Sequence, residues 1–234
     1  MPRGNPVILQ SVSFTNQGEA TEHFKAMLAR YAPGQWVGSE DAARLYELLL
    51  RHPEAETKIG CGITAFSVMM TEHGTPCFRI HRRDGSGTDF SYRQAIVGRP
   101  RSAKQEVLRA FRHAVQDDIF ALRNTLFGPC DTGTGTVACA LTGTTLTRET
   151  CHIDHAPPMT FERIVIEYIA AWGYTLESMP TTHGADDQAH TRLTDPRLAA
   201  HFREHHRQVA RLIPIRKEIN LAQASQHRLR HAIA

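Results

Sequence analysis

An Asp-His dipeptide in the C-terminal half is the part of this sequence best suited to catalysis. It lies in the segment Cys151-His-Ile-Asp-His155, which an alanine and two prolines follow. A carboxylate can hold a hard metal ion, and an imidazole whose pKa is near neutral can take a proton from water. Hydrolysis of a phosphodiester needs a base to make hydroxide and a cation to stabilise the charge that builds on the phosphate. Asp154 and His155 are therefore candidates for phosphodiester hydrolysis, and an ordinary surface or loop pair is the open alternative until the surrounding segments are considered.

Strand geometry limits how these side chains can share a site. Neighbouring residues of a strand point to opposite faces, so Asp154 and His155 converge only if the backbone bends between them. Pro157-Pro158 indicates that the strand ends soon afterwards. His152, two residues before Asp154, lies on the same face as Asp154, where we expect it to contact a phosphate or to support the metal site.

The segments around this pair resemble the HNH (ββα-metal) nucleases. They are most similar to a phage and bacterial subgroup with the pattern C-x-x-T-G, then H-x-D-H-x-x-P-x-T-F, a helix with Y/H-H-R, an apolar strand, and N-L in the last helix. The resemblance covers about residues 138 to 228. The matching segments are Cys139-Ala-Leu-Thr-Gly143, Cys151-His-Ile-Asp-His155, Pro158-Met-Thr-Phe161, His205-His206-Arg207, Ala210-Arg-Leu-Ile-Pro-Ile215 and Ile219-Asn220-Leu221.

The resemblance implies a role for each matching residue. Asp154 is expected to be a metal ligand, His155 the general base that activates water, and Asn220 the second metal ligand. The implied cofactor is Mg²⁺ or Mn²⁺, and the implied products carry 5′-phosphate and 3′-hydroxyl ends. His227 follows Asn220 on the same face of the last helix, so it is a candidate for metal or phosphate binding, with a simple surface histidine as the open alternative.

Two departures from the family pattern affect these expectations. Many HNH domains place C-x-x-C-N before the last helix to bind zinc, whereas this chain has Arg216-Lys-Glu-Ile-Asn220, so no structural zinc is expected. Apolar packing of Ile213, Ile215 and Ile219 would replace the metal. In addition, 64 residues lie between His155 and Asn220, so the helices expected at 160–172 and 196–210 would form an insertion.

The N-terminal half resembles a second family, the DCL domain, over roughly residues 11 to 97. Proteins with this domain are linked in plants to chloroplast ribosomal RNA maturation, which implies a nucleic-acid-binding or target-positioning module. Lys58, Arg79, Arg82 and Arg83 are then its candidate phosphate contacts, and exposed sheet charges are the open alternative. The motifs are Phe14, Ala20, Phe24-Lys25, Leu28, Leu48, Arg51-His-Pro-Glu54, Lys58-Ile-Gly-Cys-Gly-Ile63, Cys77-Phe78, Ile80, Arg82, Asp84-Gly-Ser86 and Asp89-Phe-Ser91.

Hydrophobic periodicity and turn residues predict an α+β protein. The expected organisation is a small α+β DCL-like domain at 1–98, a linking helix at 99–127, and an HNH-type domain with a helical insertion at 128–234. The expected helices are 19–31, 40–51 (with Ser39 as N-cap), 101–127, 160–172, 196–210 (with Asp195 as N-cap) and 218–231. The expected strands are 63–70, 77–81, 136–141, 150–154 and 212–215, with a loop at 181–194.

Charge is distributed unevenly along the chain. The net charge is +3, but from His201 onward seven Lys or Arg residues face only two Glu residues. Such basic segments suit a phosphate backbone, and a solvated helix face is the open alternative. The candidate nucleic-acid contacts are His152, Arg82, Arg83, Arg216, Lys217 and Arg228.

Composition excludes several other protein classes. No segment approaches the roughly 20 apolar residues of a membrane span, and the N-terminus does not read as a secretory signal. The five cysteines include no C-x-x-C pair, so neither a disulfide framework nor a zinc knuckle is expected. These features predict a soluble, cytoplasmic protein.

Three functions remain in competition. The first is a metal-dependent endonuclease acting on double-stranded DNA in restriction, phage DNA processing or repair, as a homodimer if it cuts both strands symmetrically. The second is a nucleic-acid-binding or RNA-processing factor with a degenerate HNH domain. The third is a structural protein whose histidine-rich C-terminus binds metals adventitiously.

Overall fold

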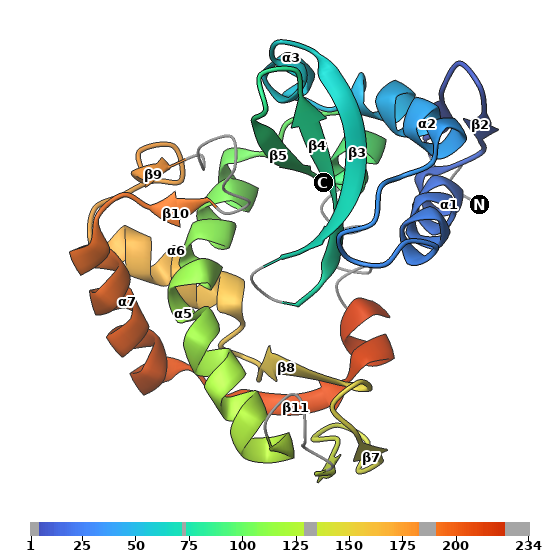
Figure 1. The fold of residues 1–234 in the computed structure, drawn as a ribbon. Coiled ribbons are helices and arrows are strands. Elements are labelled where there is room, and N and C mark those ends of the chain that lie inside the picture. The colour runs from blue at the N-terminus through green and yellow to red at the C-terminus, as the bar shows by residue number, and fades with distance from the viewer. Residues whose placement is uncertain (1–4, 72–73, 129–134, 183–190, 223–234) are drawn as a thin grey trace. The chain divides into compact units, whose positions relative to one another are not determined.

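The computed structural model describes residues 5–71, 74–128, 135–182 and 191–222. These residues fall into two compact units, with the boundary between Ser102 and Ala103. We call them unit 1 (described residues up to Ser102) and unit 2 (described residues from Ala103), and Figure 1 shows both. The protein is a mixed α and β protein with small sheets, as the sequence predicts.

Unit 1 is a three-stranded antiparallel sheet, in the order β3-β4-β5, packed against helices. One sheet face and the apolar sides of the helices share a core that includes Phe24, Leu45, Phe66, Phe78 and Phe90. The elements are β1 (Val7–Ile8), β2 (Ser13–Phe14), α1 (Gln17–Ala29), α2 (Ser39–Leu49), α3 (Ala55–Ile59), β3 (Ile63–Met70), β4 (Pro76–Arg82), β5 (Gly87–Phe90) and α4 (Tyr92–Val97).

The two helices predicted in unit 1 are found within two residues of their expected limits, whereas α3 was not predicted. The Asn16 side chain accepts a hydrogen bond from the Glu19 backbone N–H, which satisfies one free donor at the start of α1. The prediction that Ser39 caps α2 was wrong, because Ser39 is already helical and Gly38 is the N-cap, without a side-chain hydrogen bond.

The described part of unit 2 contains the helices α5, α6 and α7, a further helical segment after the last strand, two short antiparallel strand pairs and a longer two-stranded ribbon. Its elements are α5 (Ala103–Phe127), β6 (Val137–Ala138), β7 (Thr145–Leu146), β8 (Cys151–His155), α6 (Phe161–Ala171), β9 (Thr181–Thr182), β10 (Arg192–Leu193), α7 (Pro196–Val209) and β11 (Leu212–Arg216). Residues 217–222 are helical as well. The region predicted as a loop at 181–194 includes the short antiparallel strand pair β9–β10.

The long helix α5 is part of the core of unit 2 and not a separate linker. Its buried residues Val107, Phe111 and Val115 pack with residues of α6 and α7, among them Ile164 and Phe202. A strip of apolar residues along one side of a helix is stable only when another element covers it. The apolar side of α5 thus anchors α6 and α7, the two helices that the resemblance to HNH nucleases makes an insertion.

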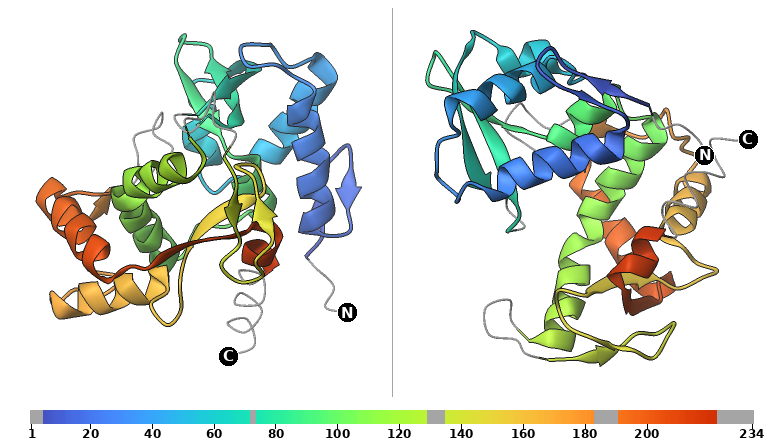
Figure 2. Two further views of the ribbon diagram at one scale, coloured as in Figure 1. Left: turned by 90° about the horizontal axis from the view of Figure 1, so that it is seen from below. Right: turned by 90° about the vertical axis from the view of Figure 1, so that its right-hand side faces the viewer.

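The far end of α5 carries a second, smaller core. Phe127 packs there with Leu146, Cys151 and Ile215, so the β6–β7 hairpin lies by the C-terminal end of α5 in Figures 1 and 2. The expected packing of Ile213 and Ile215 is found in this cluster. The four cysteines in the described residues, Cys61, Cys77, Cys139 and Cys151, are free.

No helix among the described residues is both long enough and apolar enough to cross a membrane.

Candidate functional site

The ribbon of β8 and β11 positions the residues that the sequence singles out. The strands pair antiparallel, with His152 opposite Ile215 and Asp154 opposite Ile213. Successive side chains of a strand alternate between its faces. His152 and Asp154 therefore lie on one face of β8, which we call the Asp154 face, and His155 lies on the opposite face.

Asn220 joins the Asp154 face from the helical turn that follows β11. Its side-chain Nδ2 donates a hydrogen bond to Nδ1 of His152, with 3.0 Å between the atoms. Because Nδ1 accepts this bond, neutral His152 carries its proton on Nε2, which can donate to a phosphate oxygen. The bond also uses the nitrogen end of the Asn220 amide, so its Oδ1 is the end that can face a cation.

Lys217 and Arg123 act electrostatically on His152, and Arg112 acts both on Asp154 and on His155 of the opposite face. Burial lowers the pKa of His152, and Lys217 and then Arg123 lower it further, whereas Asp154 opposes the shift. Arg112 interacts with Asp154, and its guanidinium carbon lies 4.1 Å from the ring centroid of Phe161. A carboxylate and an amide oxygen on a face that cations influence suit a metal ion together with an anionic substrate.

His155 has a different environment on the opposite face. Only 3% of the residue is exposed. Its Nε2 shares a hydrogen bond with Nε2 of His206 on α7, at 2.8 Å, and its ring packs against Phe161. Burial lowers the pKa of His155 to about 3, and the charges of Arg112 and His206 contribute to the shift. Its Nδ1 is buried and has no hydrogen-bond partner.

The donor set on the Asp154 face fits Mg²⁺ better than zinc. Within the described residues, no group of three or more His, Cys, Asp or Glu side chains could hold a metal ion. Mg²⁺ needs fewer protein ligands, because it keeps several waters and binds through one or two carboxylates plus substrate phosphates. Asp154 and Asn220 provide oxygens of that kind, whereas His227, the third predicted ligand, lies outside the described residues.

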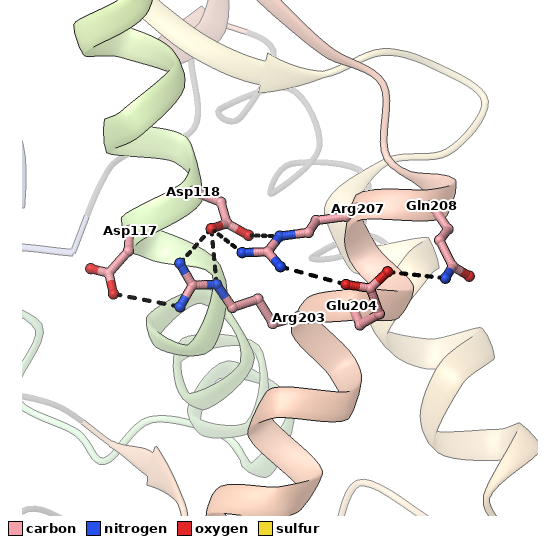
Figure 3. A network of polar contacts seen from close by, with 6 residues as sticks. All are labelled: Asp117, Asp118, Arg203, Glu204, Arg207 and Gln208. Atoms are coloured by element: carbon pink, nitrogen blue, oxygen red, sulfur yellow. Dashed lines mark hydrogen bonds and ion pairs between the residues drawn. The ribbon is translucent and has the colours of Figure 1, made fainter.

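A network of ion pairs fixes α7 to α5 (Figure 3). Asp118 of α5 accepts hydrogen bonds from Arg203 and Arg207 of α7, and the Arg207 Nε lies 2.8 Å from Asp118 Oδ2. The bond from Arg203 lowers the pKa of Asp118 well below its usual range, burial opposes this, and Arg207 adds to it. Asp118 therefore holds α7 where His206 meets His155.

This network changes the interpretation of the basic C-terminal segment. Arg203 and Arg207 are paired with Asp118, and the predicted nucleic-acid contact Arg216 is paired with Glu218 at 2.9 Å. Lys217 is exposed, and Arg228 lies outside the described residues. Much of the apparent basic surface is thus balanced by acids within unit 2.

The structure separates the two arginines predicted to bind nucleic acid in unit 1. The prediction that Arg82 contacts nucleic acid was wrong. Arg82 is buried and donates to the backbone carbonyls of Lys58 and Thr57 and to the Ser86 hydroxyl. Its role is to hold α3 against the sheet. Arg83 is exposed and remains available for a phosphate contact.

Arg123 was not predicted from the sequence to contribute to the site. Arg112 and Arg123 are eleven residues apart on α5, which is about three helical turns, so they project from the same side. This periodicity could have linked both arginines to one surface. It could not have identified Asp154 and His152 as their neighbours, because that contact depends on tertiary packing.

Comparison with known proteins finds similarity over the N-terminal part. The family described as Protein of unknown function (DUF3223) matches residues 25–96. The DCL homolog of Arabidopsis thaliana, a chloroplastic protein, is 37% identical over 98 residues, which is 38% of this chain and 44% of that protein. DNA-directed RNA polymerase IV subunit 1 of the same plant is 30% identical over 99 residues, 41% of this chain and 7% of the subunit.

The matched parts are less than half of these plant proteins. A solution NMR structure of an uncharacterized protein from Rhodospirillum rubrum is 41% identical, covers 41% of this chain and 91% of its own, and has a TM-score of 0.38. The residues that the family matches all lie in unit 1. Unit 1 therefore contains a DCL-like domain, at residues 25–96, that matches DUF3223.

Proposed function

We propose that unit 2 is an HNH-type endonuclease domain that hydrolyses phosphodiester bonds in DNA with a divalent metal ion. The observation that carries the proposal is the Asp154 face, where Asp154 and His152 lie together and Asn220 bonds to His152. The cations Arg112, Arg123 and Lys217 act on the same face. An acid alone could be structural, but an acid beside amide, imidazole and cationic groups suits a metal-bound phosphate.

Asp154 and Asn220 would hold the metal through a carboxylate oxygen and the amide Oδ1. When bound, Mg²⁺ or Mn²⁺ supplies positive charge that stabilises the negative charge developing on the phosphate. His152 would donate from Nε2 to a non-bridging phosphate oxygen, because its Nδ1 already accepts from Asn220. Arg112, Arg123 and Lys217 would hold the strand near the site by charge.

His155, which the resemblance implies as the general base, needs a rearrangement to act. Its Nδ1 has no partner and offers a lone pair in the tautomer whose Nε2 donates to His206, but the residue is almost fully buried. Its Nε2 is bonded to His206. His155 can reach a water beside Asp154 only if the end of β8 turns when the substrate binds.

Cleavage of supercoiled plasmid by the full chain tests the proposal. We expect nicked or linear product with Mg²⁺ or Mn²⁺ and no product with EDTA. The His155→Ala and His206→Asn variants then separate the two possible roles of His155. If His155 is the base, His155→Ala abolishes cleavage and His206→Asn retains it at a temperature where both variants are folded. Activity of His155→Ala equal to the wild type would remove His155 from the mechanism.

A second function is favoured by the burial of His155. A protein whose predicted base is bonded into its core could bind nucleic acid without cutting it. Unit 1 supports a nucleic-acid connection in either case, since one relative is named as a subunit of an RNA polymerase. Salt-sensitive binding with no metal-dependent cleavage would support this binding or RNA-processing role and exclude the endonuclease. In both functions unit 1 would position the target.

A further inference from the structure

The sheet of unit 1 has a second face, which lies away from its phenylalanine core. Along β4, the buried Phe78 and Ile80 alternate with half-buried Cys77, Arg79 and His81. Strand pairing sets Ser67 of β3 and Asp89 of β5 beside Arg79, and Gly87 of β5 beside His81. We call the face formed by Ser67, Arg79, His81, Gly87 and Asp89 the outer face of the sheet.

An exposed tryptophan lies over the edge of this face. Trp36 is 58% exposed, and its ring centroid lies 4.5 Å from that of His81. Its backbone forms an isolated β-bridge with Ser67, whose Oγ is 2.8 Å from Nε2 of His81. Hydrogen bonds between neighbouring residues and β3, from Val37 N–H to the Phe66 carbonyl for example, fix the segment. The indole is therefore held in place while much of it remains accessible.

A guanidinium extends across the same face. A Cβ atom at position 87 would lie only 3.0 Å from Nε and Nη2 of Arg79, so glycine there leaves room for the arginine side chain over β5. Burial lowers the pKa of His81, and the nearby charge of Arg79 lowers it further. The carboxylate of Asp89 is balanced by Lys58, with 3.6 Å between Lys58 Nζ and Asp89 Oδ1. The outer face thus places a guanidinium and an imidazole beside an exposed aromatic ring.

We propose that the outer face binds single-stranded nucleic acid, with a base stacked on Trp36 and the backbone held by Arg79 and Arg83. Every unpaired base exposes a ring face, and stacking on an aromatic side chain combined with basic groups is how single strands are bound without sequence preference. A duplex hides those ring faces. The guanidinium of Arg79 and the exposed ring of Trp36 together offer the two groups that such a strand needs, a donor to its phosphates and a surface for its bases. The inference rests on the proposed function only in requiring a nucleic-acid target.

Fluorescence can test this directly, because the chain has two tryptophans, Trp36 and Trp172. In the Trp172→Phe variant of the full chain, Trp36 is the only reporter. Adding a thymidine oligonucleotide of about 12 nucleotides in EDTA should quench its emission saturably. In the Trp36→Phe variant, Trp172 is 54% exposed and also packs on a histidine, His201, so it is a matched control that should not respond.

Binding constants of further variants provide the second measurement. Trp36→Ala should weaken oligonucleotide binding roughly 5- to 150-fold, from the usual contribution of one stacked base, and Trp36→Phe should weaken it less. Arg79→Gln should reduce by about one the slope of the logarithm of the binding constant against the logarithm of the salt concentration. Melting temperatures like that of the wild type would show that the variants fold, as the exposure of Trp36 leads us to expect.

Two results would overturn the inference. One is unchanged Trp36 emission at low salt with oligonucleotide in large excess. This result would exclude a single strand and favour a protein as the partner of the outer face. The other is wild-type affinity in Trp36→Ala. Because these measurements are made without a divalent metal, they fail or succeed independently of cleavage by unit 2.

Discussion

His152 and His155 lie three residues apart on β8, on opposite faces, and their surroundings differ in almost every respect. His152 is half-buried, bonds to an amide and lies among cations beside Asp154. His155 is buried, bonds to His206 and packs on Phe161. One face of β8 thus offers polar groups to a ligand, and the other uses an imidazole to join a strand to α7. A motif that names both residues does not by itself assign both to one site.

The largest expected effect tests the polar face. Asp154→Asn keeps the shape of the side chain but removes its charge, so it should lower plasmid cleavage about 1000-fold, since metal binding contributes several kcal/mol to such reactions. Thermal melting should change little because Asp154 is not in the core. The matched control is Asp117→Asn on α5, where the carboxylate is 79% exposed. Equal activity of the Asp154→Asn variant and the wild type would exclude the Asp154 face as the metal site.

The second-largest expected effect is a difference in unfolding free energy between the alanine variants of His155 and His152. His155→Ala leaves Nε2 of His206 buried without its partner and opens space beside Phe161, so it should cost about 2–4 kcal/mol of unfolding free energy. His152→Ala should cost less than about 1 kcal/mol, because the side chain is only partly buried. Urea unfolding followed by circular dichroism measures both. Similar losses would show that the two faces do not differ as described.

A third test concerns Asp118, which holds α7 in place beside the buried pair of His155 and His206. Asp118→Asn removes the charge that pairs with Arg203 and Arg207, which should cost about 2 kcal/mol at neutral pH. The folded-state pKa of Asp118 is depressed, so its contribution is present above the unfolded value of about 3.9 and is lost as pH falls below it. Urea unfolding at several pH values should therefore show the difference between wild type and variant shrinking in acid. A difference that is constant with pH would contradict this account.

The smallest effect sharpens the role of Asn220. Asn220→Ala should raise the Mg²⁺ concentration needed for half-maximal cleavage by about tenfold, the lower end of the range for losing a group that supports a metal. Asn220→Asp, which restores an oxygen ligand, should recover most of the affinity. A magnesium titration of cleavage measures both variants. Unchanged magnesium dependence in Asn220→Ala would assign Asn220 only to the orientation of His152.

Local patterns determined many of the elements, because periodicity and capping act over a few residues. The stripe of α5, the Asp195 cap of α7 and the strand that became β11 were all predicted near their observed limits. The DCL-like character of unit 1 also followed from spaced motifs. The N-cap of α2 was not predicted, because Gly38 has no side chain that would mark it in the sequence as a hydrogen-bonding cap.

The sequence by itself determined that His152 and Asp154 share a face of β8, because side chains of a strand alternate, but it left open whether a bend in the backbone brings His155 to that face. Only the tertiary structure decided what each face meets. Asn220 reaches one face and His206 the other, through contacts between residues as many as 68 positions apart. The same holds for Arg203 and Arg207, which read as a phosphate-binding run until Asp118, 85 and 89 positions away, is found beside them. No local pattern predicts such pairs, because they form only when α7 and the ribbon pack against α5.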